Sequence, residues 1–224
     1  SLRLPKSDRL LEHYREPHHM NRRLIFLLPL LVPVQNGCFR NTAPIHFYML
    51  RPLTPAESPQ AAIPRADRGP VIGLGPIRLS DYLDRPQIVT AVSEQEYRLA
   101  EDHRWAERLD QTLTRVMAEN LSALVPTERV VFHPWPHQQK VDAQVTANIQ
   151  EFHVDAAGQV RLAAQWAVRR GEKTLVTRKS SCRLAASGTD YAKIVDAQSQ
   201  CVGQLSREIA NSVRLLFGSP RDGR

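Results

Sequence analysis

Alternating apolar and polar residues in the second half of the chain predict three consecutive strands. Apolar residues recur at every second position through 141–149 and 160–168, and a weaker alternation in 176–184 places Val176, Ser180, Cys182 and Leu184 on one side; this is the period of a strand with one buried face. The intervening sequences Ala-Ala-Gly at 156–158 and Arg-Gly-Glu at 170–172 are typical of hairpin turns. We therefore expect an antiparallel meander with one face in solvent.

Two longer segments show the three- and four-residue spacing of amphipathic helices. The first spans 103–124, ends at Val125-Pro126, and has an apolar stripe made of Trp105, Leu109, Leu113, Val116, Met117, Leu121 and Leu124. The second runs from Asp190 to about Phe217, before Gly218, and its stripe is Tyr191, Ile194, Val195, Val202, Leu205, Ile209, Val213 and Leu216. Both stripes are expected to face the core.

The first half of the chain predicts further strands. The segment 45–53 (IHFYMLRPL) has the alternation of a strand. One side would carry Ile45, Phe47 and Met49, and the other His46, Tyr48 and Leu50. PVIGLGPIRL, RPQIVTAV, EYRLAE and the segment 129–135 also read as strands, while five prolines in 52–70 indicate an exposed connection. We expect a single α+β domain over 45–217, with a mostly antiparallel sheet, two long amphipathic helices packed on one face, and a disordered tail at 218–224.

Charge does not indicate a nucleic-acid binder. The formal net charge is +7, but residues 1–37 hold six Lys or Arg and three Asp or Glu, which leaves +4 for the remainder. No basic helix, RNA-binding aromatic strand or zinc-ligand spacing accompanies this excess. Nucleic acid is therefore not expected as a partner.

The segment MNRRLIFLLPLLVPVQNGC, at 20–38, has the layout of a secretory signal peptide. Two arginines precede the apolar residues Leu24 to Val34, which are too few to cross a bilayer because a spanning helix needs roughly 20. The alternative is a buried strand or helix of the domain, but both faces of the segment are apolar and Gln-Asn-Gly follows as a turn. We interpret 20–37 as the signal peptide.

Gly37-Cys38 resembles the cleavage junction of bacterial lipoproteins, in which the cysteine is acylated. Gln35 and Asn36 depart from the usual lipobox, which bears on the efficiency of processing. We expect lipidation at Cys38, a tether over 38–44, a true start at Met20, and an upstream over-read at 1–19. In enterobacterial sorting, a residue other than Asp after the cysteine favours the outer membrane.

The remaining candidate chemistry is sparse. His133 and His137 are four residues apart, but the neighbouring prolines forbid a helical metal pair and no further ligand completes a site. No nucleophile with a base stands out, so neither an enzyme, a metal nor a cofactor is expected. Cys182 and Cys201 are expected to be two buried free thiols, because their estimated distances from the strand–helix turn differ by too much for a disulfide.

Several motifs together resemble the PqiC family, the auxiliary lipoproteins of ABC-type intermembrane transport systems. The most specific are LSDYLDRPQIVT at 79–90 and DHRWAERLDQTLTRVMAENLSALVP at 102–126. The likeness runs from about Thr42 to Leu216 and adds FYML at 47–50, PW at 134–135, DAAG at 155–158, GTDYAKIVDAQS at 188–199 and LSREIA at 205–210. This resemblance implies an outer-membrane-anchored, periplasm-facing lipoprotein that works with an MCE-domain protein in lipid transport and envelope integrity. It also implies no catalytic site and a homo-oligomeric ring.

Residues within these motifs fall into two groups. Tyr82, Leu83 and Arg85 are candidates for a partner or oligomer surface, with structural framing of the turn as the alternative. Arg207 and Glu208, with Ser206 beside them, lie on the polar side of the second helix, which is either a solvated face or a subunit contact. Structural roles are expected for Asp81, Asp84, Pro86, Arg104, Trp105, Trp135, Asp190 and Tyr191. The alternative function is a periplasmic lipoprotein that regulates an envelope enzyme, such as a peptidoglycan synthase, through protein contacts.

Overall fold

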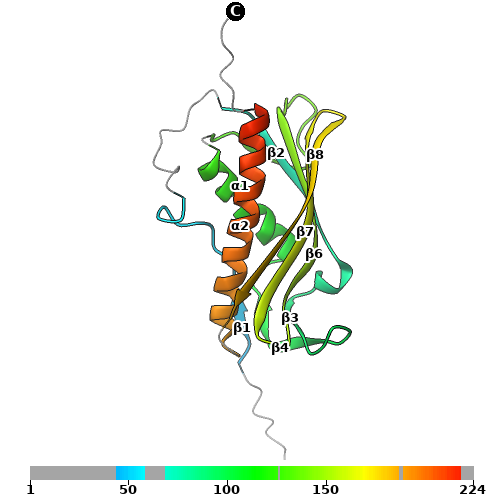
Figure 1. The fold of residues 1–224 in the computed structure, drawn as a ribbon, viewed down its shortest axis with the longest axis vertical. Coiled ribbons are helices and arrows are strands. Elements are labelled where there is room, and N and C mark those ends of the chain that lie inside the picture. Colours follow the sequence, from blue (N-terminus) through cyan, green and yellow to red (C-terminus); the bar gives the residue numbers. More distant parts are fainter. Residues whose placement is uncertain (1–43, 59–68, 126, 187–188, 218–224) are drawn as a thin grey trace, which may run out of the picture. The chain divides into compact units, whose positions relative to one another are not determined.

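The computed structural model describes residues 44–58, 69–125, 127–186 and 189–217, all of which belong to one compact unit, Thr42–Arg224. The expectations for the leader 20–37, for Cys38, for the over-read 1–19 and for the tail 218–224 lie outside the described residues. The described part holds an eight-stranded sheet and two α-helices (Figure 1). The strands are β1 His46–Tyr48, β2 Ile72–Leu79, β3 Gln87–Ala91, β4 Tyr97–Trp105, β5 Val130–Phe132, β6 Ala143–Val154, β7 Gln159–Arg170 and β8 Lys173–Ala185.

The predicted meander is confirmed, because β6, β7 and β8 pair antiparallel in sequence order. Its two hairpin turns place Gly158 and Gly171 at φ of 73° and 54°, the left-handed region that glycine adopts without strain. The sheet as a whole, however, is mixed. β1–β4, β2–β5, β2–β6 and β3–β6 pair parallel, while β3 and β4 pair antiparallel. Side-chain alternation predicts strands but not the direction in which distant strands pair. The expectation of a mostly antiparallel sheet is therefore confirmed only in part: the long ladders β6–β7 and β7–β8 are antiparallel, and the shorter parallel ladders make the sheet mixed.

The first helix, α1, begins later than its apolar spacing predicts, at Leu109, and ends at Leu124. Trp105 therefore ends strand β4 and does not anchor the helix. Its backbone N–H donates to the carbonyl of Pro86 at 2.7 Å, and it pairs with Tyr48 of β1. The Trp105 side chain is buried against Phe152, with ring centroids 6.1 Å apart. The spacing of Trp105 from Leu109 fits a helix, but it fits the end of a strand equally well. In the structure, the backbone hydrogen bonds of Trp105 place it in β4.

The second helix, α2, spans Tyr191–Phe217 and starts where Asp190 caps it. One carboxylate oxygen of Asp190 accepts hydrogen bonds from the backbone N–H groups of Ala192 and Lys193, at 3.0 and 3.3 Å. The helix contacts β6, β7, β8 and α1, and α1 contacts β2 and β5 (Figure 1). Between the helices, the Asn120 side chain donates to the buried Ser206 hydroxyl at 3.2 Å.

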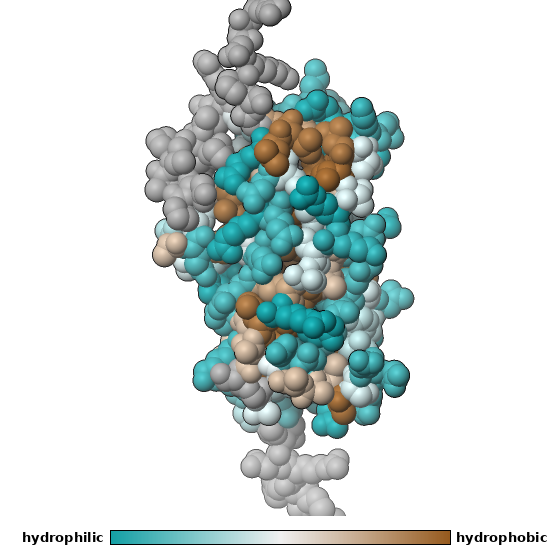
Figure 2. Space-filling model, in the orientation of Figure 1, coloured by the Kyte–Doolittle hydropathy of each residue, from teal (hydrophilic) through white to brown (hydrophobic). Residues whose placement is uncertain are grey.

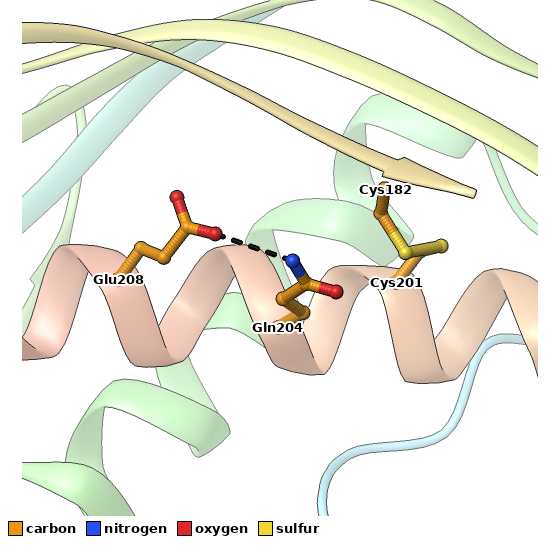
Figure 3. Close-up of a disulfide and its surroundings, with 4 residues drawn as sticks. All are labelled: Cys182, Cys201, Gln204 and Glu208. Atoms are coloured by element: carbon orange, nitrogen blue, oxygen red, sulfur yellow. Dashed lines mark hydrogen bonds between the residues drawn. A yellow bond between two sulfur atoms is a disulfide. The ribbon is translucent and has the colours of Figure 1, made fainter. Parts of the chain in front are cut away.

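Cys182 and Cys201 form a disulfide, with Cα atoms 5.5 Å apart, so the expectation of two free thiols was wrong (Figure 3). Cys182 lies three residues before the end of β8, which is about 10 Å of strand. Cys201 lies ten residues into α2, which is about 15 Å of helix. The expectation of free thiols assumed that the helix follows the strand directly, whereas five positions separate Ala185 from Tyr191. A connection of five residues is long enough to bridge the difference of about 5 Å between the two distances.

Candidate functional site

An aromatic and histidine stack joins β1, β4 and the start of α2. The ring of His103 lies 3.8 Å from that of Tyr191 at an interplanar angle of 10°, and 5.3 Å from that of His46. The hydroxyl of Tyr48 is within hydrogen-bond distance of His103 Nδ1, at 2.9 Å. Three segments far apart in the sequence are therefore held together near the N-terminal end of the described domain.

The phenols of this stack are poorly suited to proton transfer. Burial raises the pKa of Tyr191, with a smaller contribution from Tyr48. Burial also raises the pKa of Tyr48, and the carboxylate of Asp190 adds to the rise. Both hydroxyls thus stay protonated at neutral pH, and the stack is best described as a structural joint.

A shallow groove of about 640 Å³ lies between the β3–β4 turn and the β6–β7 hairpin. His153 is buried at its floor, Tyr97 stands edge-on to that ring at 5.3 Å, and Arg161 pairs with Glu151 at 3.4 Å. Burial lowers the pKa of His153, so the imidazole is neutral at neutral pH. The groove therefore offers polar and aromatic contacts from three strands and a turn.

The predicted surface around η2 (Asp81–Leu83) is only partly a surface. Leu83 is 1% exposed and belongs to the core, so it is not available to a partner. Tyr82 is half-buried, with its ring 4.8 Å from Tyr97 and its hydroxyl donating to the carbonyl of Gln150 at 3.1 Å. Burial raises the pKa of Tyr82 above its ordinary range. In this short helix the side chain of Leu83 faces the core. The sequence pattern did not indicate which side of the segment is buried.

The polar residues of the same segment make local contacts. Arg85 donates to the backbone carbonyl of Asp81 at 3.3 Å. Asp84 lies 3.6 Å from Arg108, just before α1. Arg104 donates to the carbonyl of Glu101 at 3.1 Å. These contacts are all with neighbouring residues of the same chain, and the structural roles of this segment stay a prediction.

On α2, the predicted surface residues have partners within the chain. Arg207 donates to the backbone carbonyl of Glu57 at 2.9 Å. Glu208 accepts hydrogen bonds from the Ser180 hydroxyl and, at 3.4 Å, from Gln204 (Figure 3). Both charged side chains remain half-exposed, whereas Ser206 is fully buried and faces α1. The polar side of this helix is therefore narrower than its sequence indicated.

The loop histidines His133 and His137 lie on either side of Pro134, Trp135 and Pro136. His133 stands edge-on to Trp135 at 5.4 Å, and the Trp135 ring lies over Gly73. Within the described parts of the chain, no three His, Cys, Asp or Glu side chains gather in a way that could hold a metal ion. An added Cβ at Gly73 would come within 2.8 Å of the indole, so this glycine permits the close packing of Trp135 against β2.

Sequence reasoning missed two features of the surface. The groove residues Tyr97, His153 and Arg161 come from three strands and carry no local motif. Exposed apolar side chains also gather where α2 ends, at Leu215 and Leu216 (Figure 2). Both features depend on which strands and turns become neighbours, so a single alternation pattern could not reveal them.

Of the helices described, none is long and apolar enough to cross a membrane.

Two solved structures share the fold of this chain. A crystal structure of an uncharacterized protein matches with a TM-score of 0.63 at 21% identity, covering 76% of this chain and 99% of the other. A Xanthomonas campestris protein of the DUF330 family matches with a TM-score of 0.64 at 15% identity, covering 76% and 95%. At these identities the likeness shows a shared fold.

Sequence comparison assigns the family. No protein of curated function matches this chain. The profile of the ABC-type transport auxiliary lipoprotein component matches residues 48–210, which include all eight strands except the first two residues of β1, together with most of α2. The chain therefore belongs to the family of ABC-type transport auxiliary lipoprotein components.

Proposed function

We propose that this protein is a PqiC-type lipoprotein, anchored in the outer membrane and facing the periplasm, that assists an MCE-domain protein in lipid transport between the two membranes. The family match over residues 48–210 is the observation that carries the proposal. Within that family, the motifs at 79–90 and 102–126 favour the PqiC type. The role is binding and docking, with no catalysis and no cofactor.

Cysteine usage supports the anchor. The chain has three cysteines, and the structure joins Cys182 to Cys201. Cys38 is therefore the one thiol that the disulfide leaves, and it directly follows the predicted signal peptide. A buried disulfide also suits an oxidising compartment such as the periplasm. Export followed by acylation of Cys38 accounts for all three cysteines.

The proposed assembly is a homo-oligomeric ring. The half-exposed side chains of Tyr82, Arg85, Arg207 and Glu208 are the candidate contacts with neighbouring copies or with the MCE partner. Each makes a hydrogen bond within its own chain that fixes its position. Prepositioned polar side chains lose less conformational entropy on binding.

Mass measurement of the mature N-terminus tests the anchor. We expect an acylated Cys38, processing blocked by globomycin, and the protein in the outer-membrane fraction of a sucrose gradient. A Cys38→Ser variant should lose the modification, whereas a matched variant with Cys182→Ala and Cys201→Ala should keep it. A soluble mature protein that is insensitive to globomycin would refute the anchor.

Affinity purification from crosslinked envelopes tests the partner. We expect an MCE-domain protein to co-purify with the wild-type chain. Recovery of a peptidoglycan synthase without an MCE protein would instead support regulation of an envelope enzyme. Native mass measurement of the purified protein tests the ring, and a monomer at micromolar concentration would contradict it.

A further inference from the structure

Exposed apolar side chains lie in and directly beside strand β1: Phe47 within the strand, and Ile45 and Met49 as the residues that flank it, which together we name the outer row. Successive side chains of an extended chain point to opposite sides, so the two-residue spacing places these three on one side. His46 and Tyr48 occupy the other side, where they join the stack with α2. The outer row is 43%, 64% and 45% exposed, respectively, although side chains of this type are usually buried.

The position of the row in the sheet leaves it accessible. β1 is an edge strand of the sheet, and among the described strands it pairs only with β4. Phe47 lies directly across from Arg104, whose side chain is 32% exposed. Cross-strand partners project to the same face, so a long cationic side chain borders the apolar row. Arg104 is held by Glu101, whose carbonyl accepts from it at 3.1 Å and whose carboxylate lies 3.9 Å away. Apolar side chains bordered by such a partly exposed charged pair match the boundary between acyl chains and lipid headgroups.

The distance to the proposed anchor is short. Six residues, 39–44, separate Cys38 from Ile45. Even fully extended, six residues span only about 20 Å, which is less than the thickness of a bilayer. An acylated Cys38 therefore keeps β1 close to the membrane surface whatever path these residues follow.

We infer that the outer row inserts into the lipid leaflet that holds the acyl chains of Cys38, as a second and noncovalent membrane contact that orients the domain; this inference rests on the proposed acylation. A tether alone would leave the domain free to rotate over the surface. Insertion of β1 fixes which end of the domain faces the membrane and which end faces the periplasm. The anchor also offsets the entropic cost of the contact, because the row is already concentrated at the bilayer.

A lipid leaflet fits the row better than a second copy of the chain does. A stable interface between proteins buries about 800 Å² on each partner, and three partly exposed side chains in and beside a three-residue strand fall well short of that area. A leaflet needs no matching surface, and it is brought to the row by the neighbouring anchor. The geometry therefore favours lipid as the occupant.

Photo-crosslinking identifies the occupant directly. The benzophenone amino acid p-benzoylphenylalanine replaces Phe47 in the full chain expressed in cells, with the same replacement at Phe132 as a matched control. Phe132 is also a phenylalanine, is 50% exposed, and lies on the edge strand β5. After irradiation, we expect a phospholipid adduct by intact mass at position 47, at a yield at least about five-fold above that at position 132.

Each other outcome overturns the inference. A crosslinked dimer of this chain at position 47 would assign the row to a second copy, and an adduct with another protein would assign it to a partner. Equal lipid yields at positions 47 and 132 would show only proximity to the membrane. No lipid adduct at position 47 would show that the row stays in water.

The acylation of Cys38 and the insertion of the outer row can be tested separately. The mass of the mature N-terminus reports acylation independently of crosslinking. Where Cys38 is not acylated, its thiol is coupled to a maleimide lipid in phosphatidylethanolamine and phosphatidylglycerol vesicles, and the crosslinking is repeated. A lipid adduct with this artificial tether would support insertion of the outer row and refute only the acylation of Cys38. No adduct with this tether would refute insertion of the outer row as well.

Discussion

The disulfide between Cys182 and Cys201 is expected to supply a substantial share of the stability of this domain. Its two cysteines are 19 residues apart, and cross-linking a loop of this size restricts the unfolded chain by about 3 kcal/mol. For a domain of this length, such a loss corresponds to a fall in Tm of roughly 6–12 °C. Both sulfurs are buried between β8 and α2, so reduction also loosens the contact of the helix with the sheet.

Urea denaturation followed by circular dichroism measures this effect in the Cys38→Ser background, which removes the thiol that could exchange with the disulfide. We compare the oxidised protein, the same protein with reductant, and the Cys182→Ala, Cys201→Ala double variant. The reduced protein and the variant should lose about 3 kcal/mol and unfold with a larger m-value, because the uncrosslinked unfolded chain exposes more surface. Equal midpoints for the oxidised and reduced protein would refute the reasoning, as would two titratable thiols in the unreduced, unfolded chain.

Three further substitutions test other parts of the structure by urea denaturation. Asn120→Ala should cost about 1–3 kcal/mol, because it removes the acceptor of the Leu53 backbone N–H and the donor to the buried Ser206 hydroxyl; a loss below 0.5 kcal/mol would contradict this. Gly73→Ala should cost about 1–3 kcal/mol, since its methyl would come within 2.8 Å of Trp135, and unchanged stability would show that the ring moves freely. Hydrogen bonds from Arg51 lower the pKa of Glu57 from 4.5 to about 2. This stabilisation is present above pH 4.5 and is lost as the pH falls toward 2, so Glu57→Gln should flatten the pH dependence there; parallel wild-type and variant curves would refute it.

The local elements could be predicted from the sequence because each has its own period. The alternation in 141–184 gave the meander, and the three- and four-residue spacing gave α2 with its start at Asp190. The end of β4 could not be separated from α1, because Trp105 fits both a helical stripe and a strand that pairs with β1. The expected surface at Leu83 failed for a similar reason, since a three-residue helix has too few positions to show which side faces the core.

The sequence by itself determined the class of elements, the candidate anchor at Cys38 and the motifs that carry the family resemblance, because each is encoded in contiguous residues. The tertiary structure decided the parallel pairing of β2 with β5 and β6, the disulfide and the exposure of the outer row. These depend on the lengths and paths of connections between distant segments. The pattern of Ile45, Phe47 and Met49 is the same whether that side of β1 is buried or open, and only the absence of a packed neighbour among the described elements leaves it exposed.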